Sequence, residues 1–300
     1  MKKLFSLLAI GAIVLGMASC GDKNSPEQPT PVGAINGKFS VAPGNQVYFS
    51  QGNLQYHQDK AAAHNDHFAF AEHQYTIIGE EGNAGIDKVP CTIDLFGWGT
   101  GNSPRKTSTD VADYAEFHKW GNNRIRNGGN EANLWRTLTS DEWDHIFHGR
   151  ANAKNYFSLG HIYLNSAHTD SVNGVFLLPD EWALPDGLTF NPILTQSEIS
   201  FEENGNLGNR YRYEKNTYNL NGYNLEEWNA MEKAGAIFLP AAGFRHDKDY
   251  ILHYDPKDQQ GYYWTSTKGK AFGFDHMYIN IFRNDFPFWG YSVRLVQDVK

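Results

Sequence analysis

Short apolar runs separated by turn-forming residues recur along most of the chain. The runs are rich in Val, Phe, Tyr and Leu, which pack well in β-sheets, and Gly and Asn punctuate them. This pattern predicts many short strands rather than a helical bundle. The expected strands cover residues 38–42, 46–50, 53–57, 66–71, 157–164, 174–178, 236–239, 261–266, 272–282 and 291–297.

Two segments follow a helical pattern instead. The first begins with the capping box Thr139–Glu142 and ends at Gly149, and the second begins with Asn224–Glu227 and ends at Gly235. The acidic residues of both first turns stabilise the helix dipole, so we assign them no catalytic role. The apolar side chains expected to face the core are Trp143, Ile146 and Phe147 in the first helix and Leu225, Trp228 and Met231 in the second.

Two long stretches, 99–133 and 200–223, show neither pattern. Both are rich in Gly and Asn, and we expect them to be irregular. Connections of this length within a domain tend to be functional or mobile.

The C-terminal part alternates between aliphatic residues and residues that are polar or aromatic. Successive side chains of a strand point to opposite faces, so Met277, Ile279 and Ile281 should face the core. The other face then carries aromatic and amide side chains, a composition typical of recognition surfaces. The expected ligand-binding residues are Phe274, His276, Tyr278, Asn280, Phe282, Asn284, Asp285, Phe286, Phe288, Trp289 and Tyr291.

The alternative is that both faces of this strand are buried between two sheets. Asn280, Asn284 and Asp285 favour the exposed interpretation, because each polar group would need a hydrogen-bond partner if it were buried.

The N-terminus predicts export and lipid anchoring. Met1–Lys3 is basic, Leu4–Met17 is apolar and uncharged, and Met17–Cys20 resembles the lipobox of bacterial lipoproteins. We expect a signal peptide over residues 1–19, lipidation of Cys20, a flexible spacer over 20–34 and one domain over 35–300. The expected location is the outer membrane, with membrane contact through the lipid alone. The alternative is ordinary secretion, with Cys20 unmodified.

Composition and charge exclude further classes of protein. Hydrophobic residues make up 40% of the chain and charged residues 20%, which is enough apolar surface for a core. The formal net charge is −8, and no stripe of Lys and Arg is present. Because nucleic acids are bound mainly through their phosphates, we expect no nucleic-acid partner.

Catalytic chemistry is sparse in the sequence. Apart from Cys20 the only cysteine is Cys91, which we interpret as a small buried side chain rather than a nucleophile. The sequence lacks a Gly-x-Ser-x-Gly elbow, a phosphate-binding loop, a dinucleotide fingerprint and a His-Glu-x-x-His helix. We therefore predict that the protein is not an enzyme.

Metal ligands cannot be assigned from the histidines. His64, His67 and His73 lie in one region, and His145 and His148 are three apart on the first expected helix. The sequence places no Asp, Glu or Cys partner beside them. A loop-rich domain also suits Ca²⁺, although no loop has the spacing of an EF-hand. We expect no cofactor and leave a structural calcium ion as the open alternative.

Seven motifs stand in a characteristic order along the chain. They are GNLQY at 52–56, DLFGWG at 94–99, LTSDEW at 138–143, LPDEW at 178–182 with LPDG at 184–187, FLPAAG at 238–243, YWTST at 263–267 and SVRLV at 292–296. Together they resemble a family of Bacteroidetes surface lipoproteins. The domain of that family is similar to the C-type lectin-like fold of formylglycine-generating enzymes and of variable proteins diversified by retroelements. The resemblance, over about residues 46–297, implies an α+β fold with two short helices packed on a twisted, mostly antiparallel sheet with long irregular loops.

Departures from those relatives narrow the expected function. Formylglycine-generating enzymes use late cysteines, and this chain has none after Cys91. Calcium-dependent lectins carry a Trp-Asn-Asp motif, and the nearest tripeptide, Arg283–Asp285, lacks the Trp. In the retroelement-diversified proteins the variable ligand-binding residues precede the terminal Arg-Leu-Val strand, a placement that residues 274–291 match.

We therefore expect a cell-surface binding protein that presents residues 274–291 to an extracellular protein or glycan. The alternatives are a structural or adhesion subunit of a surface assembly and, third, an enzyme that uses Cys91 or a histidine cluster.

Overall fold

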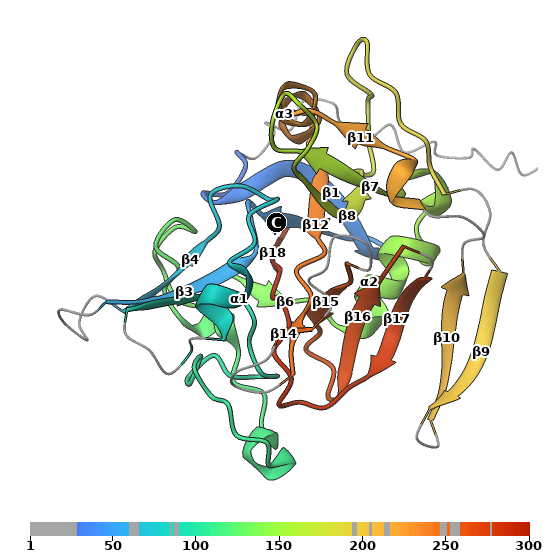
Figure 1. The fold of residues 1–300 in the computed structure, drawn as a ribbon. Helices are drawn as coiled ribbons and strands as arrows, with labels where there is room; N and C mark the ends of the chain where they lie inside the picture. The colour runs from blue at the N-terminus through green and yellow to red at the C-terminus, as the bar shows by residue number, and fades with distance from the viewer. Residues whose placement is uncertain are drawn as a thin grey trace, which may run out of the picture.

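Short strands make up most of the regular structure, and the helices between them are small (Figure 1). The computed structural model describes residues 29–59, 66–84, 86, 90–193, 197–203, 206–212, 217–246, 251–252, 259–276 and 278–300. Within these ranges the expected α+β class is confirmed, and no helix is both long and apolar enough to cross a membrane. The predicted signal peptide, Cys20, His64 and Met277 lie outside the described residues.

The first and last described strands share one antiparallel sheet. In spatial order its strands are β1 (Ala34–Ala42), β2 (Asn45–Ser50), β18 (Leu295–Asp298) and β6 (Arg136–Thr137). Phe39 and Phe49 turn inward, and their rings meet edge to face at 5.0 Å. The strand expected over 291–297 is shorter than predicted, because its ladder pairing begins only at Leu295.

Both predicted helices are present with their predicted caps. α2 (Ser140–Asp144) begins after Thr139 and continues as a π-helical turn over His145–Gly149. α3 (Leu225–Lys233) begins after Asn224. In each helix the cap side chain accepts a hydrogen bond from the N–H of the glutamate that follows, whose carboxylate accepts one from the cap N–H in return. Glu142 and Glu227 therefore complete the two capping boxes that the sequence predicts.

A third helix, α1 (Gly79–Asn83), has no counterpart in the prediction. Its sequence, GEEGN, has two glycines and no apolar stripe, so its local helical preference is weak. Its C-terminal end is instead held by hydrogen bonds to another part of the chain. The buried Asn83 side chain accepts hydrogen bonds from the N–H groups of Asp94 and Leu95 at 3.1 and 3.0 Å.

A second four-stranded sheet supports α3. Its order is β11 (Gly222–Tyr223), β7 (Phe157–Tyr163), β8 (Ser171–Leu177) and β12 (Ile237–Pro240), and only the β11–β7 pair is parallel. Trp228 of α3 is fully buried, with ring contacts to Phe176 and Phe238. Trp143 of α2 is buried in a separate core cluster that includes Phe49 and Phe272.

A three-stranded antiparallel sheet lies on one flank. Its order is β4 (His67–Phe70), β3 (Leu54–Gln58) and β5 (Cys91–Ile93). The 99–133 stretch packs beside it, where Ile125 bridges to Phe68. Apart from isolated bridges, this stretch contains only the 3₁₀ turns Val111–Tyr114 and Trp120–Asn122, so its predicted irregularity is confirmed. Further 3₁₀ turns cover Ala153–Asn155 and Thr217–Asn219, and a small sheet pairs β13 (Phe244–Arg245) with β14 (Ile251–Leu252).

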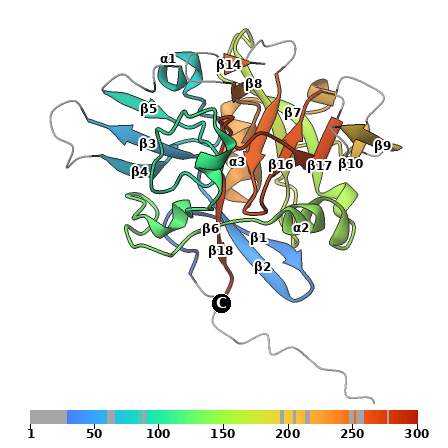
Figure 2. The same cartoon turned by 90° about the horizontal axis from the view of Figure 1, so that it is seen from below.

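An antiparallel five-stranded sheet lies on the opposite flank (Figures 1 and 2). Its order is β15 (Gly261–Trp264), β16 (Lys270–Phe274), β17 (Tyr278–Asn284), β10 (Asn206–Arg212) and β9 (Ser197–Glu203). Two predictions were wrong here. The stretch 200–223 contains β10 and part of β9, which are held by pairing with each other and with β17 rather than by an apolar pattern of their own. Residues 272–282, expected as one strand, form the hairpin of β16 and β17.

Candidate functional site

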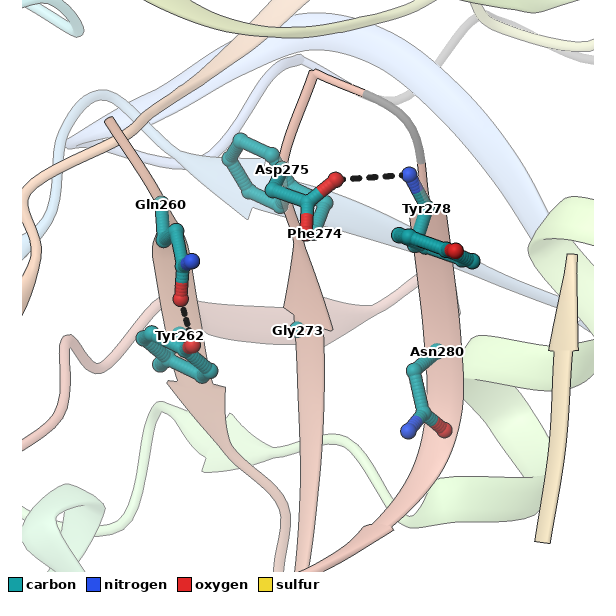
Figure 3. Close-up of a pocket in the computed structure, with 7 residues that line it drawn as sticks. All are labelled: Gln260, Tyr262, Gly273, Phe274, Asp275, Tyr278 and Asn280. Atoms are coloured by element: carbon teal, nitrogen blue, oxygen red, sulfur yellow. Dashed lines mark hydrogen bonds between the residues drawn. The ribbon is translucent and has the colours of Figure 1, made fainter. Parts of the chain in front are cut away.

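A hollow opens on one face of the five-stranded sheet, where a glycine separates two larger side chains (Figure 3). Tyr262 of β15 pairs with Gly273 of β16, and Gly273 pairs with Asn280 of β17. Side chains of directly paired residues lie on the same face of a sheet, so the missing side chain of Gly273 leaves a gap in this row. The cavity has a volume of about 140 Å³, and its other lining residues are Gln260, Phe274, Asp275 and Tyr278.

The hairpin turn beside the hollow is held by Asp275. Its Oδ1 accepts a hydrogen bond from the Tyr278 N–H at 2.8 Å, and its own N–H donates to the Tyr278 carbonyl at 2.9 Å. Aspartate favours such turns because its short carboxylate substitutes for a backbone acceptor. The apolar–polar alternation runs on through this turn and conceals it, which is why the single-strand prediction was wrong. His276 consequently lies in the turn and not on a strand face.

The two faces of β17 follow the prediction at its start. Ile279 is fully buried in the core, and Tyr278 is half-buried beside the hollow. Asn280 was expected to face solvent, but its side chain is only 5% exposed and lies in the hollow (Figure 3). Phe274 was expected on the ligand face and instead packs in the core, because the turn pairs it with Ile279. The structure does not describe the side chains of Phe282 and Ile281, so the prediction for these two residues is not tested.

The alternation fails again beyond Asn280, where β17 contains a bulge. Gly273 pairs with Asn280, yet Ala271 pairs with Arg283, so the step from 280 to 283 on one strand opposes the step from 271 to 273 on the other. A bulge changes which residues share a face. Asn284 was expected to continue the ligand-facing row, but it leaves that row and accepts a hydrogen bond from the Lys270 ammonium group.

Three aromatic side chains, Phe286, Phe288 and Trp289, form a second part of the predicted surface, which we call the aromatic ridge. The Phe286 side chain is 46% exposed, and its ring lies 5.3 Å from that of Phe288 and 5.2 Å from that of Trp289. Trp289 contacts Phe244 at 5.0 Å, and Phe244 contacts Tyr262 at 5.2 Å. Ring contacts thus connect the aromatic ridge to the hollow. Asp285, just before the ridge, is half-buried.

Tyr291 was predicted to face a ligand and is fully buried instead. Its ring stacks on Tyr262 at 4.9 Å, and its backbone forms a bridge with Phe96. Pro287 and Gly290 interrupt the alternation before this point, so the chain turns inward where a regular strand would have continued.

Sequence reasoning missed four residues of the hollow, namely Gln260, Tyr262, Gly273 and Asp275. Gln260 directly precedes β15, Tyr262 lies in β15, Gly273 lies in β16 and Asp275 lies in the turn, and the prediction did not bring these segments beside β17. The Tyr262 hydroxyl donates a hydrogen bond to the Gln260 side-chain oxygen. The only available signal was the alternation within 261–266, which places Tyr262 on the face opposite Tyr263.

The other residues considered as a nucleophile or as metal ligands do not line the hollow. Cys91 lies in β5, and burial raises the pKa of its thiol, which disfavours the thiolate that a nucleophile needs. Within the described ranges no three His, Cys, Asp or Glu side chains come together to hold a metal ion. His148 has a neighbour that the sequence analysis did not identify, since its Nδ1 lies 2.7 Å from a carboxylate oxygen of Asp144.

Phenol, amide and carboxylate groups line the hollow, so it can hydrogen-bond a polar group and stack against it. No protein-family model matches the chain, and neither a curated protein nor a solved structure matches it. What this site does must therefore be argued from its own residues.

Proposed function

We propose that the chain is a lipid-anchored cell-surface binding protein with a C-type lectin-like domain. Its ligand is an extracellular protein or glycan, and it binds over the hollow and the aromatic ridge. The two capped helices, the predominance of antiparallel strands and the C-terminal position of the hairpin support this assignment of fold. Diversification of residues 274–291 by a retroelement is part of the same proposal.

The hollow beside Gly273 carries the proposal. Its volume is about 140 Å³, whereas sites that enclose a whole small molecule have roughly 300–1,000 Å³. The hollow therefore suits one group of a larger ligand, such as a single side chain or the substituent of one sugar ring. The aromatic ridge offers the additional contact area that such a ligand requires.

The side chains at the hollow are suited to recognition. Tyr262 and Tyr278 are rigid aromatic groups with polar ends, and Asn280 adds an amide with donor and acceptor atoms. Amphipathic aromatic residues of this kind often supply most of the energy of an interface.

The test is a binding screen with the full-length chain in detergent, probed on arrays of glycans and extracellular proteins. Replacement of Tyr278 by Ser should weaken the binding found in that screen at least about tenfold, because it removes an aromatic anchor. Its Tm should change little, since Tyr278 is only half-buried. The matched control is Tyr163→Ser, which removes another half-buried tyrosine, from β7.

If the wild type and Tyr278→Ser are both folded and bind the ligand equally well, the hollow is not part of the binding surface. Loss of binding in Tyr163→Ser to the same extent would show that the effect is not local. Ile279→Ser serves as the opposite case, since it should lower the Tm by placing a hydroxyl in the core.

A further inference from the structure

The three-stranded sheet lies on the flank opposite β16 and β17 (Figures 1 and 2). A polar groove runs along it. It consists of two hollows of about 430 and 410 Å³, which share His67 and Arg126 in their linings. One wall comes from β3, β4 and β5, and the other from the irregular 99–133 stretch. The function proposed above makes no use of this groove.

Two histidines face each other across the strands at the centre of the groove. His57 of β3 pairs with His67 of β4, and their rings stack with centroids 4.9 Å apart and an angle of 13°. Thr92 of β5 lies beside them, with its Oγ1 3.2 Å from Nδ1 of His57. The stacking places two groups that become cationic on protonation directly against each other.

An arginine adds a permanent positive charge to this pair. The backbone N–H of Arg126 is fixed to the Phe68 carbonyl at 2.9 Å, while its side chain is exposed. Burial lowers the pKa of His57, and the positive charges of His67 and Arg126 lower it further. The potential at His57 is therefore positive.

The charged neighbours that shift the pKa of His57 are His67 and Arg126, and both lower it, so the carboxylates of the groove do not dominate at this ring. Asp66 accepts hydrogen bonds from the Tyr56 hydroxyl at 2.9 Å and from the Asp59 N–H at 3.1 Å, so its carboxylate is engaged along the hairpin. The Asp59 side chain is exposed at the edge. Within the described part of the chain, neither Arg124 nor Arg126 forms an ion pair.

We propose that this groove binds an acidic polysaccharide, with a sulfate or carboxylate group held between His57, His67 and Arg126. Two adjoining hollows accommodate consecutive units of a polymer. The exposed amides of Asn102 and Asn130 are suited to hydrogen-bond sugar hydroxyls. The chain as a whole carries a charge of −8, so general attraction does not favour a polyanion, and binding must depend on this local cluster.

This site predicts a definite dependence on pH. In the free protein the lowered pKa of His57 keeps its imidazole neutral near pH 7. A bound anion favours the protonated ring and raises that pKa, so binding takes up a proton. Affinity should therefore rise as the pH falls from 7.5 towards 5.5.

The experiment uses the full-length chain in detergent and measures binding to dextran sulfate, polygalacturonate, neutral dextran and polyglutamate. The first two probes separate sulfate from carboxylate recognition, and the last two separate a sugar backbone without charge from charge without sugar. Replacement of Arg126 by Gln should weaken binding to the preferred acidic glycan about tenfold or more, because it removes a charged contact. Lys154→Gln, which removes one exposed cation from a different part of the chain, should have little effect.

Several outcomes would overturn the proposal. These are equal losses in Arg126→Gln and Lys154→Gln, equal binding of neutral dextran, stronger binding of polyglutamate than of either acidic glycan, and affinity that does not rise at lower pH. Tyr278→Ser should leave binding of the acidic glycan intact. The proposal for the groove can therefore be contradicted while the proposal for the hollow is supported, and the proposal for the hollow can be contradicted while that for the groove is supported. The resonance of the His57 ring should also titrate at higher pH when the acidic glycan is bound.

Discussion

A buried carboxylate in the DLFGWG motif carries a measurable energetic cost. Asp94 is fully buried, and burial raises the pKa of its carboxyl from 3.8 to about 6, although the Asn83 amide donates to it at 2.7 Å and the Ile78 N–H at 3.1 Å. The folded state therefore binds a proton more tightly than the unfolded state at this residue. Between about pH 4 and pH 6 the folded protein loses stability as the pH rises, and the cost levels off above pH 6.

This cost can be measured with Asp94→Asn. A pKa rise of this size corresponds to a cost on the order of 3 kcal/mol above pH 6. The free energy of unfolding in urea should fall between pH 4.5 and pH 7 in the wild type by more than it does in the variant. The amide removes one acceptor, so the variant can be less stable at every pH, and only the difference between the two pH values is diagnostic. An identical difference in both proteins would show that Asp94 does not titrate in this range.

At the scale of elements, the sequence predicts best where local signals and burial agree. The capping boxes at Thr139 and Asn224 mark helix starts without reference to the rest of the chain. α1 could not be predicted, because it depends on Asn83 meeting the distant Asp94. The β16–β17 hairpin was missed for a related reason, since only the Asp275 side chain signals the turn within an unbroken alternation.

Helix α3 offers the clearest test of an element. Trp228 is fully buried against Phe176 and Phe238, so Trp228→Ala should destabilise the domain by roughly 3–5 kcal/mol through lost burial and a cavity. Asn229→Ala on the exposed side of the same helix should change stability by less than about 0.5 kcal/mol. Urea unfolding of both variants is the measurement. A Trp228→Ala protein with wild-type stability would contradict the packing of α3.

At the scale of the whole molecule, sequence patterning predicts most strands but not which of them meet. The hollow depends on Tyr262, Gly273 and Asn280 aligning across three strands, and no pattern within a single strand encodes that register. The bulge between Asn280 and Arg283 likewise arises from pairing, and it limits how far alternation can identify a surface. The fold class and the buried faces of the two capped helices are thus accessible from the sequence, whereas the shape of a site built across strands is not.

The lipid anchor that we propose concerns the whole protein, and it can be tested separately from the hollow and the aromatic ridge. The basic start, the apolar run Leu4–Met17 and the small residues before Cys20 predict that this cysteine carries a lipid. When cells are grown with a labelled fatty acid, the wild-type protein should be labelled and the Cys20→Ala variant should not. Cys20 precedes β1, and β1 belongs to a different sheet from the hollow, so the unlipidated variant should keep the wild-type Tm and bind the ligand found in the array screen unchanged. Ser19→Ala is the matched control and should be labelled normally, since alanine is as small as the residue it replaces. A labelled Cys20→Ala protein would place the lipid elsewhere, and an unlabelled wild type would favour secretion without an anchor.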